Sequence, residues 1–152
     1  MDSDKEKSIG LLKELEEKHG GKITHRTFAI WACLPPGCEY SNGMFLYRIG
    51  DTYYYEDFDK GDMNILGFTV KRKKDKPFVK TEGTFMYSDV MRVFKVTKSS
   101  ARQFYFKKKL NEDHSIKKAG VLSRFFKECV FAVQLKSGDM LFFQMMDNII
   151  SK

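Results

Sequence analysis

The chain has 152 residues, of which 42% are apolar and 14% aromatic, and a net charge of +7. This length fits one ordinary domain, and this much buriable side-chain surface excludes a disordered chain. No uncharged apolar stretch approaches the roughly 20 residues that span a bilayer, and the positive charge favours anionic partners. We predict a single domain over residues 1–152, with a helix at about 4–19 and a β-rich body at about 22–146.

The chain begins with a segment that predicts an amphipathic helix. Ile9, Leu12 and Leu15 lie at helical spacing among charged residues. Gly20 follows at the place where a helix ends in a left-handed C-cap, because glycine adopts that conformation without steric cost. We therefore expect a helix over residues 4–19 that packs on a sheet.

The residues after this helix predict strands, because aromatic and β-branched residues gather in short runs between turn residues. Gly50-Asp51 predicts a tight two-residue turn that joins two of these runs as a hairpin. The charged loop 74–77 predicts the tip of a second, longer hairpin. The expected strands in this part are residues 22–34, 44–49, 52–58, 65–73, 78–87, 90–97 and 102–108.

The pattern then changes to a late helix and a closing hairpin. Ser115 is a suitable N-cap for a helix of about three turns that packs through one apolar face. That face consists of Ile116, Ala119, Leu122, Phe125 and Phe126. Residues 129–135 and 140–146 flank Ser137-Gly138 as the final hairpin.

These elements together define the expected fold class. About 7–9 strands, joined mostly by short turns, bury their apolar faces when the sheet curls or packs on itself. We therefore predict an α+β, mostly β domain, built as an antiparallel, strongly bent sheet or partly open barrel. An N-terminal helix and one late helix complete it.

Histidine and cysteine, the usual bases and metal ligands, form no recognisable site in the sequence. His19, His25 and His114 are expected at a helix end, in a strand and in a polar loop, without ligand spacing. Cys33 and Cys38 lie close together, but a second cysteine pair and a fourth ligand for zinc are missing. Motifs of hydrolases, phosphate-binding loops and zinc proteases are absent as well. We predict no catalytic residue, no metal and no cofactor.

The cysteines also bear on the compartment. Three of them cannot all pair within one chain. The chain does not open with a basic start, an apolar stretch and a small-residue cleavage site, as a secretory signal would. We therefore expect a reducing compartment and a cytoplasmic location, with Cys129 as a core residue.

Two basic clusters are the candidate binding site for an anionic ligand. The first surrounds the tip of the hairpin 65–87 and consists of Lys71, Arg72, Lys73, Lys74, Lys76 and Lys80. The second consists of Lys107, Lys108 and Lys109, followed in the chain by Lys117 and Lys118. Such side chains can converge on a lipid headgroup or on nucleic-acid phosphates. The alternative is that they are solvated charge protecting exposed strand ends.

The hairpins of residues 44–108 and 129–146 resemble the pleckstrin-homology-like (PH-like) superfold. The resemblance implies a strongly bent antiparallel sheet of seven strands, with a basic hairpin loop in the lipid-binding members. Lys71 and Lys73 fit the first part of the family's phosphoinositide pattern, whereas the residues from Lys80 onward lack its spaced basic pair. Family members end in a helix that plugs the barrel, and here only residues 148–152 remain. The resemblance implies a scaffold for peptides, proteins or membranes.

We expect a non-catalytic binding or interaction module that engages a protein or an anionic lipid surface. A nucleic-acid-binding barrel is the second hypothesis, with aromatic side chains stacked on bases. The residues for such stacking are Phe104, Tyr105 and Phe106. A small-ligand carrier or enzyme with an interior pocket is the third. The residues that would line this pocket are Tyr53, Tyr55, Phe68 and Phe85.

Overall fold

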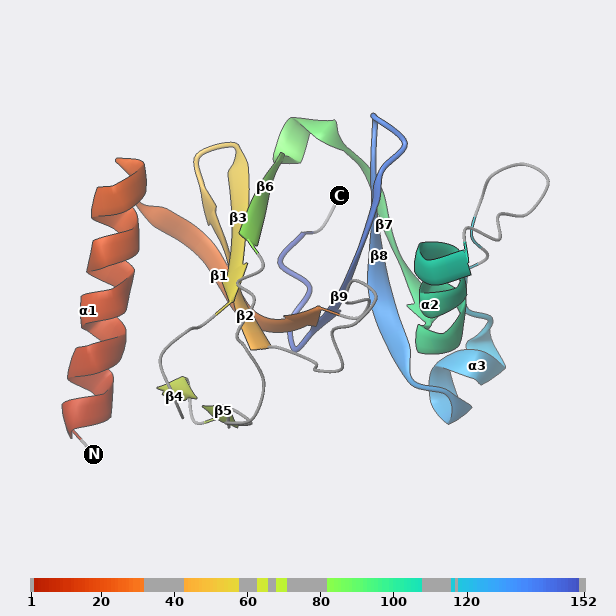
Figure 1. Ribbon diagram of the computed structural model, residues 1–152, viewed down its shortest axis with the longest axis horizontal. Helices are drawn as coiled ribbons and strands as arrows, with labels where there is room; N and C mark the ends of the chain where they lie inside the picture. Colours follow the sequence, from red (N-terminus) through yellow and green to blue (C-terminus); the bar gives the residue numbers. More distant parts are fainter. Residues whose placement is uncertain are drawn as a thin grey trace.

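The computed structural model describes residues 2–31, 43–57, 63–65, 68–70, 82–107, 116 and 118–150. Its main element is a seven-stranded antiparallel sheet, whose strands are β1 (Ile23–Trp31), β2 (Gly43–Ile49), β3 (Thr52–Asp57), β6 (Glu82–Met86), β7 (Val90–Thr97), β8 (Cys129–Leu135) and β9 (Met140–Met145). The strand order is β6-β3-β2-β1-β9-β8-β7, so the sheet does not close. It bends strongly, with β3 and β6 on one arm and β7 and β8 on the other (Figure 1). The predicted fold class, α+β and mostly β, is confirmed.

The first half of the chain follows the sequence pattern closely. Helix α1 (Asp2–His19) ends at Gly20, which has φ 69°, in the left-handed region that glycine tolerates best. The hairpin β2–β3 turns at Gly50, with φ 58°, and Ile49 pairs with Thr52 across the turn. Both the predicted helix and this predicted hairpin are confirmed.

The second predicted hairpin is paired differently in the part that the structure describes. The short strand β5 (Phe68–Val70) pairs with β4 (Met63–Ile65), while β6 pairs with β3. The expected pairing of residues 65–73 with residues 78–87 is therefore wrong for these segments. Strand pairing depends on which apolar faces meet in three dimensions, and alternation within one strand does not reveal its partner.

A helix replaces the strand predicted at residues 102–108. Helix α2 (Lys98–Lys107) begins after Thr97, whose Oγ1 accepts a hydrogen bond from the backbone N–H of Ser100 at 3.2 Å. This is the contact of an N-cap, which satisfies one of the free amides of the first turn. Phe104 packs edge-on against a phenylalanine of β9, with 5.7 Å between the ring centroids. Capping and packing thus override the strand preference of the aromatic run.

The late helix is shorter than predicted, and the side of it that was predicted to be buried is exposed. Helix α3 (Val121–Phe126) begins after Gly120, which lies in an extended conformation. Ile116 and Ala119 are buried as expected, but they precede the helix. The residues predicted on its buried face that are instead strongly exposed are Leu122, Phe125 and Phe126. Of the helices in the described part of the chain, none is both long and apolar enough to cross a membrane.

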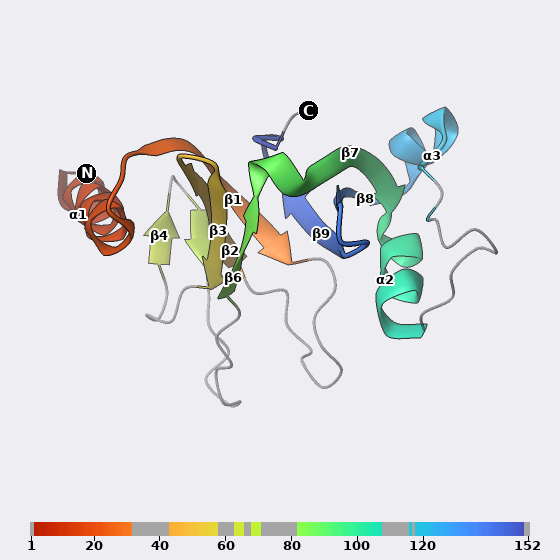
Figure 2. The same ribbon diagram turned by 90° about the horizontal axis from the view of Figure 1, so that it is seen from above.

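Apolar side chains cover both faces of the sheet. Neighbouring residues of a strand point to opposite faces of the sheet, so they contribute to different hydrophobic clusters, one on each face. The concave side holds the largest cluster, formed by Ala29, Met44, Leu46, Tyr53, Phe85, Val90, Val133, Phe143, Met145 and Ile150. On the convex side, α1 packs on Phe45 and Tyr47 of β2, and the cluster that includes Ala101 of α2 contains Phe142 of β9. The two helices therefore cover the two arms of the bent sheet (Figure 2).

The residues after β9 turn into the concave side of the sheet, between its two arms (Figure 1). Ile150 is fully buried in the concave cluster. The hydroxyl of Tyr53 donates a hydrogen bond to the carbonyl oxygen of Ile149 at 2.8 Å. Residues 146–150 form neither a helix nor a strand, yet this segment contributes to the core.

Candidate functional site

The basic residues singled out in the sequence lie almost entirely outside the described residues. Lys107 is the last residue of α2, and its side chain is not described. The residues outside the description are Lys71, Arg72, Lys73, Lys74, Lys76, Lys80, Lys108 and Lys109. Both clusters therefore stay predictions. Lys118, which follows the second cluster in the chain, is described and exposed.

The described residues instead bring cationic side chains together around α2 and α3. An open groove of about 510 Å³ is lined by Thr97, Lys98, Ser99, Arg102, Gln103, Lys127 and Glu128. We call residues 97–103 and 118–128, which form this groove and the adjoining helix α3, the α2–α3 end. It lies at the opposite end of the molecule from α1 (Figure 2).

The register between β7 and β8 builds the groove. Thr97 pairs with Cys129, so the residues that follow β7 meet those that precede β8. The backbone N–H of Lys98 donates to the carbonyl oxygen of Glu128 at 2.9 Å, and its Nζ lies 2.8 Å from the Glu128 carboxylate. The hydrogen bond from Lys98 lowers the pKa of Glu128, so this carboxylate is ionised near neutral pH.

The charge of the groove is positive. Its lining holds three cationic side chains, those of Lys98, Arg102 and Lys127, against the single carboxylate of Glu128. Arg102 and Lys127 are both exposed, and their side chains can move to meet an approaching anion. The groove is therefore suited to a phosphate or carboxylate rather than to a cation.

Helix α3 presents an unusual apolar surface beside this groove. Its exposed side chains are Val121 (71% exposed), Leu122 (74%), Phe125 (80%) and Phe126 (83%). Burial of one such side chain contributes roughly 1.5–3 kcal/mol, and a folded protein rarely leaves several together in water. A contiguous exposed group of this kind is typical of surfaces that contact another molecule.

Cations also surround α3 itself. Lys118 precedes the helix with its Nζ 6.0 Å from the Phe94 ring, Arg124 lies within it, and Lys127 follows it. Residues 114–127 contain no Asp or Glu. The apolar side chains of α3 are thus bordered by positive charge without a carboxylate among them.

A second polar cluster lies where α1 meets the convex face of the sheet. The Tyr47 hydroxyl donates to Glu56 Oε1 at 2.7 Å and lies 3.0 Å from His19 Nε2. Because the hydroxyl has only one proton, His19 Nε2 must be the donor in the second contact. Burial and the hydrogen bond to Glu56 raise the pKa of Tyr47 well above its usual range, so the phenol stays neutral. Lys18, whose Nζ lies 3.5 Å from Glu56 Oε2, completes a cluster that holds α1 on β2 and β3.

This cluster predicts a pH-dependent stability. Burial, with a smaller effect of the Lys18 charge, lowers the pKa of His19 below 6.5, and Glu56 acts in the opposite direction. Between the folded and the unfolded pKa the unfolded chain binds more protons, so the free energy of unfolding falls as the pH falls through that range. His19→Gln keeps an N–H donor for Tyr47 but does not titrate. Urea denaturation just above and just below pH 6.5 should show a smaller loss for the variant, and an equal loss would contradict this role.

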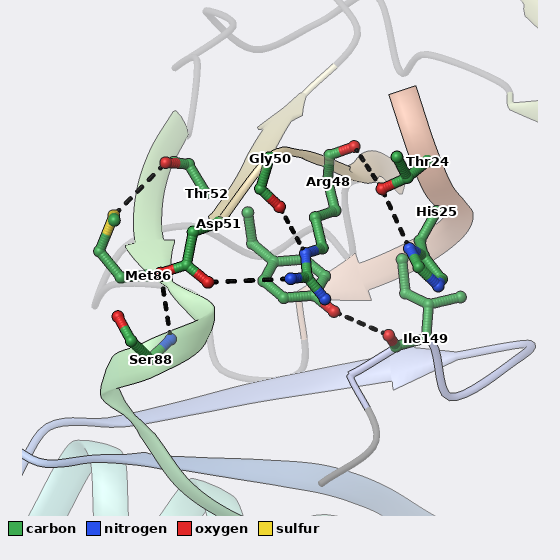
Figure 3. A network of polar contacts seen from close by, with 10 residues as sticks. Thr24, His25, Arg48, Gly50, Asp51, Thr52, Met86, Ser88 and Ile149 are labelled. Carbon is green, nitrogen blue, oxygen red and sulfur yellow. Dashed lines mark hydrogen bonds and ion pairs between the residues drawn. The ribbon is translucent and has the colours of Figure 1, made fainter. Parts of the chain in front are cut away.

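A third group of polar contacts ties the β2–β3 turn to the segment that joins β6 and β7 (Figure 3). Arg48 Nε donates to the Gly50 carbonyl oxygen at 2.8 Å, and the guanidinium carbon lies 4.2 Å from the Tyr87 ring centroid. The backbone N–H of Tyr87 donates to the carbonyl oxygen of Asp51 at 2.7 Å. Tyr87 belongs to the short 3-10 helix η1 (Tyr87–Asp89), which links β6 and β7, the two edges of the sheet. These contacts hold the β2–β3 turn against the segment that links the two edges.

The other residues considered from the sequence form no reactive constellation in the described part of the chain. His25 Nδ1 lies 3.1 Å from the hydroxyl of its neighbour Thr24, and both side chains are exposed. Cys129 is half-buried, with its thiol 3.7 Å from the Ser123 carbonyl oxygen. No group of three His, Cys, Asp or Glu residues among those described is placed to hold a metal. Cys33, Cys38 and His114 lie outside the description.

Three of the four aromatic residues considered for an interior pocket pack against one another. The rings of Tyr53 and Phe85 stack with centroids 5.0 Å apart, and Tyr55 meets Phe143 edge-on at 5.5 Å. The side chain of Phe68 is outside the description. These rings act as core residues of the concave side.

Sequence reasoning missed both halves of the α2–α3 end. Lys98 and Arg102 are four residues apart, a helical spacing that the strand prediction for residues 102–108 concealed. Leu122, Phe125 and Phe126 of α3 were recognised but were assigned to the core. No protein-family model, curated protein sequence or solved structure matches the chain significantly. The function is therefore inferred from the chemistry of the α2–α3 end.

Proposed function

We propose that this protein is a non-catalytic binding module of PH-like kind that docks on an anionic, phosphate-bearing surface through its α2–α3 end. The observation that carries the proposal is the groove in which Lys98, Arg102 and Lys127 face one carboxylate, that of Glu128. A bent antiparallel sheet of seven strands is compatible with the PH-like resemblance. The expected cytoplasmic location is compatible with a surface of this charge, because the cytoplasmic leaflet is anionic.

Electrostatics supports a surface rather than a small isolated anion. Charges in water act over about 10 Å at 0.1 M salt, so neighbouring cations on one end of a protein act together on an extended anionic partner. Each Lys or Arg near an anionic bilayer contributes about 1 kcal/mol. Arg124 and Lys118 add to the three cations of the groove.

A nucleic acid is the second candidate, because the same cations can neutralise backbone phosphates. One of the aromatic residues considered for base stacking, Phe104, packs on Phe142 of the sheet with ring centroids 5.7 Å apart. The side chains of Tyr105 and Phe106 lie outside the description. Exposed rings such as Phe125 and Phe126 can also stack on bases. The observation that favours a lipid surface is that Val121 and Leu122, which offer no ring for stacking, are strongly exposed beside them.

Charge reversal in the groove tests the proposed function. Arg102→Glu with Lys127→Glu should lower the affinity for phosphatidylcholine vesicles containing phosphatidylserine at least about tenfold, because a loss of 1.4 kcal/mol is already tenfold. Lys13→Glu with Lys136→Glu changes the net charge equally at exposed positions on α1 and on the β8–β9 turn. This control should bind within about threefold of wild type. Equal losses in both double variants, measured by vesicle cosedimentation, would contradict a localised site.

A further inference from the structure

The apolar side chains of α3 share one side of the helix. At about 100° per residue, Val121, Leu122, Phe125 and Phe126 fall within an arc of about 140°. Ser123, which is half-buried, and Arg124 fall outside this arc. Because these four side chains are strongly exposed, the helix turns a continuous apolar face away from the molecule. The helix lies at the end opposite α1 (Figures 1 and 2).

The surroundings of this face fit one kind of partner. A partner that is apolar inside and anionic at its surface matches apolar side chains bordered by Lys118, Arg124 and Lys127, and an anionic bilayer has this layering. Six residues of helix are about 9 Å long, which suits a segment lying in the interfacial layer and is far too short to span the membrane. Phenylalanine and leucine are typical of the buried side of such interfacial helices.

We propose that α3 inserts its apolar face into the interfacial layer of an anionic lipid bilayer, with Lys118, Arg124 and Lys127 at the level of the lipid phosphates. The inference rests on the proposed function, since the groove supplies the attraction that brings α3 to the surface. It goes beyond that function because it adds penetration of the bilayer to electrostatic contact. It also assigns the contact to the segment between β7 and β8, far in sequence from the basic cluster around Lys71.

Two readouts test the insertion. Phe125→Ser with Phe126→Ser should weaken binding to phosphatidylcholine–phosphatidylserine vesicles at least about tenfold, and the remaining binding should be abolished by salt. Ile9→Ser with Met91→Ser replaces apolar residues that are 54% and 57% exposed elsewhere on the surface, and should bind as wild type does. Because both pairs are exposed, the midpoint of thermal unfolding should shift by no more than about 4 °C in either double variant.

The depth of insertion is measured directly by fluorescence quenching, with the variant Phe126→Trp and vesicles that carry brominated acyl chains. The introduced indole should be quenched strongly, whereas wild type, whose single tryptophan is Trp31, supplies the background signal. The inference is overturned if the serine variant binds as wild type does, or if the indole at residue 126 shows no quenching beyond that background while the protein is bound.

The two proposals fail in different ways. Loss of binding on charge reversal, with no effect of the serine changes, would leave the proposed function standing and overturn insertion. Absence of wild-type binding to anionic vesicles would overturn both. Binding to a single-stranded oligonucleotide but not to vesicles would assign the cations to nucleic acid and overturn insertion as well.

Discussion

Phe143→Ala is expected to lower the free energy of unfolding by about 3–5 kcal/mol, which is a large part of the stability of an ordinary domain. Phe143 is fully buried on β9, at the centre of the concave cluster. Its ring lies 5.5 Å from that of Tyr55 and 6.4 Å from that of Phe85, measured between centroids. Its removal leaves a cavity between the two arms of the sheet, because the surrounding side chains relax only partially. Urea denaturation followed by circular dichroism measures the change.

The matched control is the same substitution on the exposed helix. Phe126→Ala removes an identical side chain that is 83% exposed, so it should change the free energy of unfolding by no more than about 0.5 kcal/mol. If Phe126→Ala destabilised the protein as much as Phe143→Ala, α3 would be packed against the body of the molecule. The binding role given to its apolar face would then be wrong.

Ile150→Ala is expected to cost about 2–5 kcal/mol, although it lies in an irregular segment close to the end of the described chain. The side chain of Ile150 is fully buried in the concave cluster. It follows Ile149, whose carbonyl oxygen accepts the hydrogen bond from the Tyr53 hydroxyl. Truncation to alanine removes packing on residues from both arms. The measurement is again the free energy of unfolding in urea.

Ile9→Ala provides the control for this prediction. Ile9 is 54% exposed on α1, so its truncation should cost no more than about 1 kcal/mol. A loss at Ile150 no larger than that at Ile9 would contradict the role of the terminal segment in the core. The pair thus separates core packing from a general effect of removing isoleucine.

Much of the fold is predictable because local patterns and turn chemistry agree with the tertiary structure. Gly50-Asp51 and Ser137-Gly138 turn the hairpins β2–β3 and β8–β9 at the expected places, with Gly50 and Gly138 at positive φ. The strand β7 has the predicted bounds, Val90–Thr97. In each case the alternation of a strand is bounded by residues whose backbone preferences favour a turn.

The sequence did not predict helix α2, because the composition of this segment favours a strand. Phe104, Tyr105 and Phe106 resemble a strand by side-chain preference, which measures fit to a packed surface more than a backbone tendency. The opposing signals are the cap at Thr97 and the small residue Ala101, which is fully buried one turn into the helix. These two signals favour a helix over a strand only when α2 packs against the sheet.

The α2–α3 end could not be predicted for a different reason. Arg102 and Lys127 are 25 residues apart in the sequence and share a groove only because β7 and β8 pair in one register. Helical spacing of apolar residues in α3 indicates an amphipathic helix, but it does not say whether the apolar face meets the core or another molecule. The exposure of Leu122, Phe125 and Phe126 shows only in the structure that this face does not meet the core.

The central claim, that this protein binds an anionic membrane surface through its α2–α3 end, is tested most directly by vesicle cosedimentation of wild type. Vesicles of phosphatidylcholine alone are compared with vesicles that also contain phosphatidylserine, at low and at high salt. We predict binding only to the anionic vesicles, weakened by salt and lost in Arg102→Glu with Lys127→Glu. Equal binding to both vesicle types, or none to either, would contradict the claim.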